Sequence, residues 1–478
     1  MHNLLGEALS AATCARLPCV AVRFAVKFLG CKVSQADAML ARRALLQAGH
    51  EEAPEELADV HVINTCCITS AAEAKSRQSV RRSLKRGPRE VLVSGCAVNL
   101  SAPTFGEIDP RVRTFVGIAE EVAEQIAAAA RAGAARPGAA AAPGAAAVAG
   151  ACADLEHDVG PLRGLARSPG GEHRRARGQA PGAETRTRGF LKVQDGCDCS
   201  CAYCIIPTVR GGARSRPASG VLGEARRRVA GGQPELVMTG ISVGDYRDPE
   251  RGLELGELMA EVARLPGVER VRLSSVEVIH VRDSLLEALT GEPNVCPHLH
   301  VPLQSGDNGV LEAMGRHYTA EQYLDTIATL RAAVPQVNVT TDVIVGFPTE
   351  DEAAFERTLE LIDAAGITRV HVFPYSPRPG TVAEALGDRV APEEKKRRAR
   401  ELSGRSEVRS RHHRAAKLGG RERVLVDKLA DTQVSGYTED YTRCYLPPGA
   451  GARGELVEVV CEEIQADGIR CRPAGPAP

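Results

Sequence analysis

Tryptophan is absent from this sequence of 478 residues, and aromatic side chains make up only 3% of it. Long apolar runs are missing as well: no stretch of about 18 residues is apolar enough to predict a membrane-spanning helix. Net charge is close to zero, because 60 basic residues balance 61 acidic ones. The chain is therefore not basic throughout, and any nucleic acid would have to bind at local basic patches.

Cysteine, in contrast, occurs fifteen times. Residues 1–20 show no secretory signal pattern and receive no role, so we expect a cytoplasmic protein with no membrane partner. In a reducing cytosol, clustered thiols favour metal ligands over disulfides. The length is sufficient for roughly two to four domains, each with a core of its own.

Three of the cysteines, Cys197, Cys201 and Cys204, are spaced C-x3-C-x2-C within QDGCDCSCAYCIIPTVRG. Thiolates this close can bind a four-iron cluster and leave one iron without a protein ligand. Such an open iron can chelate a small molecule. The alternative is a zinc knuckle with Cys199 as fourth ligand. Cys199 lies too close along the chain to its flanking cysteines for good tetrahedral geometry, so the spacing favours the iron–sulfur cluster.

Residues 21–125 alternate between predicted strands and helices. The strands are VRFAVKFLGC, DVHVINTCC and EVLVSGCAV, and the helices are QADAMLARRALLQAGH and AAEAKSRQSVRRSLKRG. This order predicts a doubly wound α/β domain. Cys31, Cys66 and Cys96 each follow a strand, at the edge where such sheets bind ligands. Each alone would more often be a buried core thiol, but three at equivalent positions predict a second cluster.

Residues 126–185 are rich in alanine, glycine and proline. They contain too few large apolar side chains to build a core, and proline and glycine interrupt helix formation. We therefore predict a flexible linker.

Strand–helix alternation resumes over residues 186–400. Six apolar segments predict the strands of a partial (β/α)6 barrel with its active face at the strand C-termini: TRGFLKVQDG, ELVMTGISVG, RVRLSSVEV, HLHVPLQSG, VNVTTDVIVGFP and ITRVHVFPYSP. Polar or small residues recur on that face: Thr239, Gly240, Ser274, Ser275, Glu277, Gln304, Ser305, Asp342 and Gly346. Their recurrence on one face predicts a binding site.

The C-terminal part begins with a basic connector at residues 401–417, predicted as a helix or linker. Short alternating strands and turns over residues 418–472 predict a small all-β barrel. Aromatic and basic residues there are of the kind that stack on RNA bases and contact phosphates: Tyr437, Tyr441 and Arg443. Three further thiols lack metal-ligand spacing and are predicted to lie in the core: Cys444, Cys461 and Cys471.

Several motifs resemble those of the radical S-adenosylmethionine methylthiotransferases. LGCKVSQAD, INTCCITSAAEAKSRQ and VSGCAV resemble the cysteine motifs of the N-terminal domain in that family. LSSVE, LHVPLQSGDNGVLEAMGRHYT, TDVIVGFPTEDEAAF and HVFPYSPRPGT resemble its central domain, and the terminal barrel resembles a TRAM RNA-binding domain. The resemblance implies that Cys31, Cys66 and Cys96 bind an auxiliary 4Fe-4S cluster. The family has one cysteine after the Asn-Thr pair, and the register of that motif favours Cys66 over its neighbour Cys67 as the ligand.

The resemblance also implies a catalytic 4Fe-4S cluster on Cys197, Cys201 and Cys204, whose open iron binds S-adenosylmethionine. The Tyr203 ring can face adenine, and Arg316 can pair with the methionine carboxylate or steer the substrate. A solvated helix-face arginine is the alternative for Arg316. The implied cofactor-binding residues are Tyr203, Thr239, Gly240, Ser275, Glu277, Gln304, Arg316 and Asp342.

The reaction implied by the resemblance inserts sulfur into a C–H bond and methylates it. The reduced cluster cleaves S-adenosylmethionine to a 5′-deoxyadenosyl radical, the auxiliary cluster presents sulfur, and a second S-adenosylmethionine supplies the methyl group. The implied partners are the anticodon arm of tRNA, an electron donor such as flavodoxin or ferredoxin, and a sulfur source. Basic residues that could add phosphate contacts are Arg81, Arg82, Lys85 and Arg86.

The expected substrate depends on which group within the family the chain resembles most. INTCCITSAAEAKSRQSVRR, HVFPYSPRPGT and GYTEDYTRCYLP are most similar to the group that modifies N6-threonylcarbamoyladenosine at position 37 of tRNA. The alternatives are the groups that modify N6-isopentenyladenosine in tRNA or an aspartate of a ribosomal protein. An iron–sulfur RNA-binding protein without catalytic activity is the alternative outside the enzymes.

Overall fold

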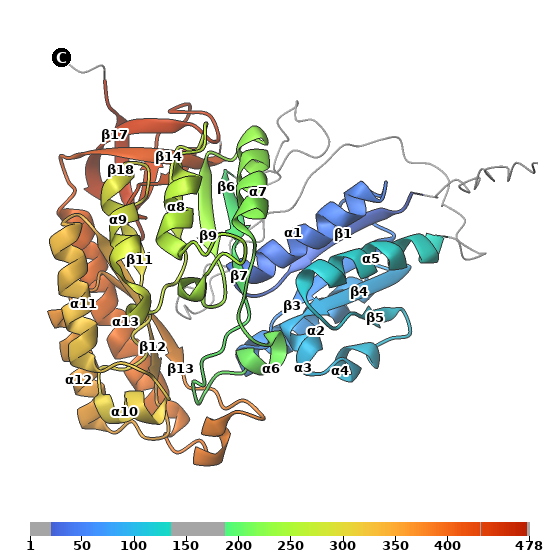
Figure 1. The fold of residues 1–478 in the computed structure, drawn as a ribbon, viewed down its shortest axis with the longest axis horizontal. Coiled ribbons are helices and arrows are strands. Elements are labelled where there is room, and N and C mark those ends of the chain that lie inside the picture. The colour runs from blue at the N-terminus through green and yellow to red at the C-terminus, as the bar shows by residue number, and fades with distance from the viewer. Residues whose placement is uncertain (1–20, 135–186, 431, 476–478) are drawn as a thin grey trace, which may run out of the picture.

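The structure is a computed structural model that describes residues 21–134, 187–430 and 432–475. Three bodies are visible in Figure 1: an N-terminal α/β domain, a central domain of strands backed by helices, and a small terminal β-barrel beside the central domain. The predicted fold class is confirmed. No helix in the described ranges is long and apolar enough to cross a membrane.

The N-terminal domain is a parallel sheet in the order β2-β1-β3-β4-β5 with helices on both faces. Alternate residues of each strand point to opposite faces, so Val62 packs with α1 and α5 while Ile63 packs with α2 and α3. The strands are β1 (Arg23–Phe28), β2 (Glu51–Glu52), β3 (Val60–Thr65), β4 (Glu90–Gly95) and β5 (Val112–Thr114), and the helices are α1 (Lys32–Gln47), α2 (Ser70–Leu84), α3 (Cys96–Leu100), α4 (Pro103–Gly106) and α5 (Ala119–Ala134).

The prediction that a linker begins at residue 126 is wrong. Helix α5 continues to Ala134, and Ile126 and Ala130 are fully buried in the core that α5 shares with α1. The alanine run looked like low complexity, but alanine is the best helix former and is small enough for two helices to pack closely. Residues 135–185 of the predicted linker lie outside the described residues.

The central domain contains the six predicted parallel strands. They form two three-stranded sheets, β10-β9-β6 and β11-β12-β13, joined by bridges such as Ser275 to His300. The result is an open barrel whose helices lie outside the strands (Figure 1). The barrel strands are β6 (Arg188–Lys192), β9 (Glu235–Thr239), β10 (Arg270–Leu273), β11 (His298–His300), β12 (Asn338–Val345) and β13 (Arg369–Pro374).

Helices and short segments complete this domain. A large apolar core lies between the strands and the outer helices. The helices are α6 (Ile206–Arg210), α7 (Ala218–Ala230), α8 (Leu255–Ala263), α9 (Asp283–Gly291), α10 (Asn308–Ala313), α11 (Ala320–Ala333), α12 (Glu352–Ala364) and α13 (Pro392–Ala415). Short strands β7 (Gln194–Asp195) and β8 (Arg214–Ser215) and the 3-10 turns Val243–Asp245, Val278–His280 and Val382–Leu386 connect them.

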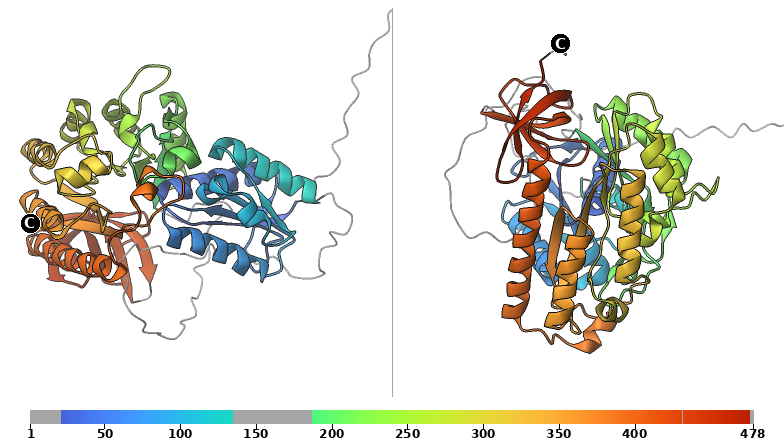
Figure 2. Two further views of the ribbon diagram at one scale, coloured as in Figure 1. Left: turned by 90° about the horizontal axis from the view of Figure 1, so that it is seen from below. Right: turned by 90° about the vertical axis from the view of Figure 1, so that its left-hand side faces the viewer.

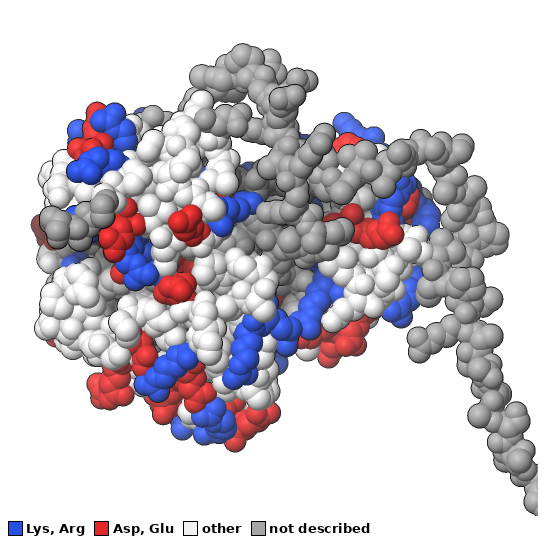
Figure 3. All heavy atoms as spheres, turned by 90° about the horizontal axis from the view of Figure 1, so that it is seen from above, with Lys and Arg blue, Asp and Glu red and all other residues white. Residues whose placement is uncertain are grey.

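Helix α13 passes through residue 400 without a break, so the basic connector predicted at residues 401–417 is mostly helix that packs on β13. In Figure 2 this helix leads to the terminal barrel. Its arginines are largely ion-paired: Arg397 contacts Glu401 at 3.0 Å, and buried Arg398 contacts Glu350 at 2.6 Å. Basic and acidic side chains are also interspersed on the face drawn in Figure 3.

The terminal barrel is closed in the order β14-β15-β16-β18-β17. Its core contains all three cysteines that were predicted to lie there, Cys444, Cys461 and Cys471. The strands are β14 (Arg421–Ala430), β15 (Gln433–Tyr437), β16 (Arg443–Leu446), β17 (Leu456–Ile464) and β18 (Ile469–Pro473).

The terminal barrel is attached to the central domain by arginines and aromatic rings. Arg270 donates to the Tyr437 carbonyl at 2.9 Å, and Arg272 donates to the Thr438 carbonyl at 3.1 Å. The Tyr441 ring stacks on His298 and on Tyr437, with centroids 5.1 Å and 4.9 Å away. The prediction that Tyr441 stacks on RNA is therefore wrong, because arginine–aromatic groups also join protein domains and this one does so.

Candidate active site

The three N-terminal cysteines lie at one edge of the parallel sheet. The chain leaves β1 toward β2 on one side and leaves β3 toward β4 on the other, so the topological switch point lies between β1 and β3. Ligands bind at this point in open α/β sheets. Cys31 follows β1, Cys66 follows β3, and Cys96 begins α3 directly after β4. Burial, with a smaller contribution from the neighbouring thiols Cys96 and Cys31, raises the pKa of Cys66 to about 12.

Two glycines allow the cysteine-bearing loops to approach each other. Gly30 has φ +114°, and a side-chain carbon there would lie 2.9 Å from the Cys66 Cβ. Gly95 has φ +95°, and a side chain there would collide with the backbone of Thr65. Cys67 is fully buried in the apolar core that also contains Cys96, and burial raises the pKa of its thiol. The choice of Cys66 as the ligand stays a prediction.

The second group of cysteines lies on the loop between β7 and α6. Cys197, Cys201 and Cys204 are partly buried, and the Cys204 amide donates to the Cys201 carbonyl at 3.0 Å. Cys199 contacts Cys197 instead: its amide donates to the Cys197 Sγ at 3.4 Å. A hydrogen bond from Cys199 also lowers the pKa of the Cys197 thiol to about 7.

Ligand spacing argues against zinc at either cysteine group. A tetrahedral zinc with sulfur ligands would bring the sulfur atoms to about 3.8 Å from one another. Within the part of the chain that the structure describes, three ligand atoms come within 4.8 Å of one another only at His300, Asp342 and His371. Both cysteine triplets are therefore wider than a zinc site.

Three of the predicted cofactor-binding residues gather beside the Cys201 thiol. The Arg316 side chain is only 5% exposed, donates to the Cys201 Sγ at 3.2 Å and forms an ion pair with Glu277. Tyr203 lies close to the same group, and burial raises the pKa of its phenol well above the usual value. The alternative of a solvated Arg316 is therefore wrong. Ser275 is exposed at the end of β10.

The other predicted cofactor-binding residues do not join this group. Thr239 is buried at the end of β9, and Gln194 fills the space beside Gly240. Gln304 is 9% exposed and has φ +68°, and its backbone N–H donates to the Asp342 carbonyl. The Asp342 side chain contacts His300 at 3.1 Å, below the strand end.

Gln194 is a structural residue that the sequence reading missed. Its side-chain oxygen accepts hydrogen bonds from the amides of Ile241 and Ser242 at 3.0 Å and 2.9 Å. Its amide nitrogen donates to the Gly196 carbonyl at 2.7 Å. Gln194 thus holds the start of the cysteine loop against the end of β9. In the sequence, the only indication of this role is that Gln194 directly precedes the cysteine loop.

A network of four buried charges joins the N-terminal domain to the cysteine loop. Asp37 of α1 contacts Lys192 and Arg210, each at 2.8 Å, and Asp195 contacts the same two cations at 2.7 Å and 2.9 Å. Arg210 also donates to the Cys96 Sγ at 3.1 Å. Burial opposes ionisation of Asp195, but Lys192 and Arg210 lower its pKa to about 2. The network is therefore charged at neutral pH.

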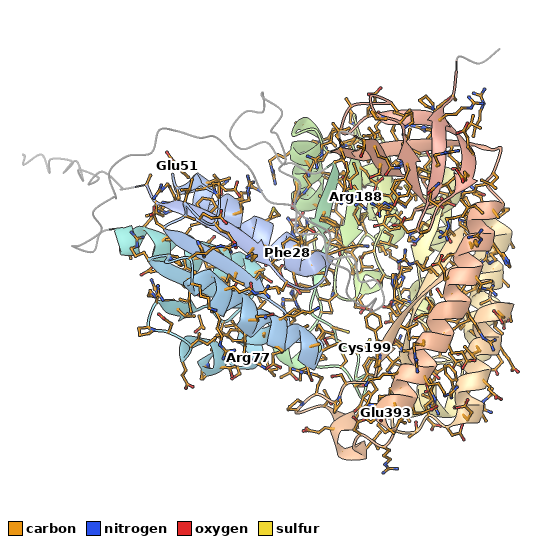
Figure 4. All side chains as sticks on the ribbon, turned by 180° about the vertical axis from the view of Figure 1, so that it is seen from behind. Phe28, Glu51, Arg77, Arg188, Cys199 and Glu393 are labelled. Carbon is orange, nitrogen blue, oxygen red and sulfur yellow. The ribbon has the colours of Figure 1, made fainter. Side chains whose placement is uncertain are left out.

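A second set of hydrogen bonds joins the N-terminal domain to the central domain. Arg378 is 4% exposed and donates to Ser70 and Glu73 of α2 at 3.1 Å and 2.7 Å. A cavity of about 320 Å³ opens beside Cys96 and Arg210. Figure 4 shows the carboxyl end of β1, marked by Phe28, directed toward the central domain, where Arg188 and Cys199 are labelled. Both cysteine groups thus lie at the boundary between the domains.

Replacing Asp37 with asparagine is expected to destabilise this boundary by about 3–5 kcal/mol, because Lys192 and Arg210 would share one carboxylate in a buried site. Asp59→Asn is the matched control: Asp59 pairs with Arg23 at 3.1 Å but is 39% exposed, so the cost should be about 1 kcal/mol or less. Thermal unfolding midpoints of the two variants measure the difference. Equal midpoints would contradict a role for the network.

Comparisons with known proteins agree with this architecture. Residues 191–362 match the Radical SAM superfamily, and residues 23–117 match Uncharacterized protein family UPF0004. A Threonylcarbamoyladenosine tRNA methylthiotransferase MtaB of Chlamydia pneumoniae is 32% identical, covering 93% of this chain and 97% of the relative. A tRNA-2-methylthio-N(6)-dimethylallyladenosine synthase of Solibacter usitatus is also 32% identical, covering 84% and 86%.

Among solved structures, the radical S-adenosylmethionine methyltransferase TsrM of Kitasatospora setae has a TM-score of 0.52 at 15% identity, covering 78% of each chain. This likeness shows the fold. The fold and the cysteine loop define a radical S-adenosylmethionine enzyme with an additional N-terminal α/β domain. Its similarity over nearly the whole length of the Chlamydia relative then places the chain in the methylthiotransferase family.

The cofactors of this family are S-adenosylmethionine and 4Fe-4S clusters. The structure fits them, because each cysteine group has a buried arginine donating to one of its sulfur atoms: Arg210 to Cys96 and Arg316 to Cys201. Such N–H donors compensate the negative charge of thiolate ligands.

Proposed function

We propose that this protein is a tRNA methylthiotransferase that converts N6-threonylcarbamoyladenosine at position 37, next to the anticodon, to its 2-methylthio derivative. The observation that carries the proposal is the position of Arg210. This residue follows the Cys204 loop in α6, and its Nε donates to Cys96 of the other domain. This contact joins the two predicted cluster sites, and transfer of sulfur to a carbon radical requires those sites to lie close together.

The predicted cluster ligands are Cys197, Cys201 and Cys204 in the central domain and Cys31, Cys66 and Cys96 in the N-terminal domain. When bound, these cofactors supply the radical, sulfur and methyl chemistry. The chain's own residues are proposed to position them: Arg316 donates to the Cys201 sulfur and pairs with Glu277, and Tyr203 lies two residues from Cys201. An electron donor such as flavodoxin or ferredoxin and a sulfur source complete the proposed reaction.

The proposed RNA substrate places the target adenosine in a loop. A loop base leaves its stack more cheaply than a paired base, and C2 must be exposed to react. The terminal barrel at residues 418–472 is proposed to hold the anticodon arm. Arg81 and Arg82 of α2, and Lys85 directly after it, are exposed and can add phosphate contacts, so binding should weaken with salt. Arg86 is ion-paired with Glu55 and contributes less.

The specificity for the threonylcarbamoyl group is supported by the relatives of that name, such as the one from Bacillus subtilis, which is 32% identical over 90% of this chain. The isopentenyl alternative has relatives of equal identity, so identity alone does not separate them. A pocket built for a polar group should reject an apolar one strongly, because its own donors and acceptors would lose their partners.

The substrate test uses the reconstituted enzyme with tRNA carrying either adenosine modification. We expect turnover of the threonylcarbamoyl substrate to exceed that of the isopentenyl substrate by about 10⁴-fold, the discrimination typical of polar pockets. Mass spectrometry of digested nucleosides measures the methylthio products. Turnover of the isopentenyl substrate alone would refute the proposed specificity. Binding without any turnover would favour the RNA-binding alternative, and modification of a ribosomal protein would favour the aspartate alternative.

A further inference from the structure

The inner face of the central barrel is polar midway along β12. Thr340 and Asp342 alternate there with Val339 and Val343, which are fully buried against the outer helices. Because neighbouring side chains of a strand point to opposite faces, Thr340 and Asp342 face the inside of the barrel. Polar groups in such a place are costly unless they have a ligand or each other as partners.

The two strands beside β12 contribute one histidine each. Leu299 of β11 packs in the outer core, so the next residue, His300, points inward. Val370 of β13 packs in the same core, so the following residue, His371, points inward as well. In the register of the sheet, His371 lies directly opposite Asp342. Two imidazoles and one carboxylate therefore meet inside the barrel.

The distances within this group are close to those of a metal site. The His300 Nε2 lies 3.1 Å from the Asp342 Oδ1, and one ligand atom from each of these residues and from His371 lies within 4.8 Å of the others. Two ligands at about 2.1 Å from one ion are about 3.0–3.4 Å apart. The first distance already has this value. A rotation of the His371 ring about χ2, which is a soft torsion in histidine, can bring in the third ligand.

The His300 ring is oriented as a ligand would be. Its Nδ1 lies 2.9 Å from the Thr340 hydroxyl, which in turn lies 3.3 Å from the Nε2 of buried His298. Histidines that bind metals usually have their other ring nitrogen held by a hydrogen bond. The contact with Thr340 engages Nδ1 and directs Nε2 toward Asp342.

The alternative is a group of polar side chains that only satisfy one another. His300 and Asp342 do so in part, but His371 does not. Among residues 21–134, 187–430 and 432–475, the His371 ring has no hydrogen bond or ion pair, and its ring contact is with His300, 5.4 Å between centroids. An imidazole inside the barrel without a partner is unfavourable, so His371 is better explained by a ligand.

An ion can also reach the site. The His300 and Asp342 side chains are 12% and 26% exposed, so they are accessible from the barrel interior. The positive charge of Lys32 opposes a cation here, but it acts on Asp342 more weakly than either histidine does. The carboxylate supplies the negative charge that a divalent cation requires.

We propose that His300, Asp342 and His371 form a binding site for a divalent transition metal ion, Zn²⁺ or Fe²⁺, separate from the two predicted clusters. Two histidines and one carboxylate are a donor set that binds these ions in enzymes and leaves coordination positions open. The open positions face the barrel interior and are available to water or to an oxygen atom of a substrate. The site goes beyond the proposed function and does not depend on which base is modified.

The experiment adds one equivalent of Zn²⁺ to the full-length, cluster-loaded protein under anaerobic conditions and removes unbound ion by desalting. Zinc is the probe because iron is already present in the clusters. Elemental analysis should find about one zinc per chain. X-ray absorption at the zinc edge should show only nitrogen and oxygen ligands at about 2.0–2.2 Å, without the sulfur ligands at about 2.3 Å that cysteines would give.

Variants then test the ligands by zinc competition with a chromophoric chelator. His371→Gln and Asp342→Asn should each weaken zinc binding by at least about 100-fold, and Thr340→Val by about 10-fold, because a group that orients a ligand contributes less than or about as much as the ligand itself. His317→Gln is the matched control, because His317 is an exposed histidine of the same domain, and it should bind zinc as the wild type does. Iron content and thermal unfolding midpoints check that each variant is folded and loaded.

Three results would overturn the inference. The first is a wild type that retains no zinc. The second is sulfur among the zinc ligands, which would place the ion on cysteines. The third is equal zinc binding by the wild type, His371→Gln and Asp342→Asn, which would mean an adventitious ion only. None of these results bears on methylthio transfer, so the proposed function is tested separately.

Discussion

Cys201→Ala is expected to abolish cleavage of S-adenosylmethionine, whereas Cys199→Ser should leave it intact. Among the four cysteines of this loop, the C-x3-C-x2-C spacing selects Cys197, Cys201 and Cys204 as the three that bind a cluster and leave its fourth iron open. The structure adds that Arg316 donates to the Cys201 sulfur at 3.2 Å, while Cys199 contacts Cys197 rather than the arginine. The measurement is 5′-deoxyadenosine formed by each reconstituted variant in the presence of a strong reductant.

The two variants control for each other, because both remove a thiol from the same partly buried loop. A general disturbance of the loop would reduce cleavage in both. Equal loss of cleavage in Cys199→Ser and Cys201→Ala would therefore refute the ligand assignment. Retention of cleavage in Cys201→Ala would refute it as well, and would bring Cys199 back as a ligand.

Replacing Cys31, Cys66 and Cys96 together with alanine is expected to remove roughly half of the iron and all methylthio transfer, with 5′-deoxyadenosine still formed. The reason is that each group of three cysteines is predicted to bind one four-iron cluster, and only the central one cleaves S-adenosylmethionine. Iron analysis and quantification of both products measure the effect. An unchanged iron content would show that the three are core thiols without a second cluster.

Cys67→Ala is the control for this triple variant. Cys67 is next to Cys66 in the chain but lies in the apolar core with Val80 and Val91. Its removal should cost about 1 kcal/mol of stability through lost packing and leave iron content unchanged. Loss of iron in Cys67→Ala with retention in Cys66→Ala would reverse the ligand assignment within this pair.

Much of this protein was determined by local sequence. The six barrel strands, the N-terminal α/β order and the terminal barrel were predicted correctly, because strand and helix periodicity is read over a few residues. The cysteine spacing within residues 197–204 is likewise local. The positions of Cys31, Cys66 and Cys96 after strands could be predicted because parallel strands end at one edge.

Predictions from local sequence were wrong at two places where contacts with distant residues override local composition. The alanine run of α5 looked like a linker, but helix α1 provides an apolar surface that buries Ile126 and Ala130. Tyr441 looked like an RNA-stacking residue, but Arg272 and His298 of another domain surround its ring. In both cases the contacting residues are distant in the sequence, so the residues next to each position do not indicate the contact.

Only the tertiary structure decided which charges meet. Lys192 and Asp37 are 155 residues apart, and Arg210 and Cys96 are 114 apart, yet each pair is in contact. Asp342 was expected near the cofactor but lies with His300 and His371 deeper in the barrel. The sequence by itself determined the elements and the cysteine motifs, because chain spacing sets them. The pairing of the buried charges depends on how the domains dock, because a charge is stable there only beside a partner that docking supplies.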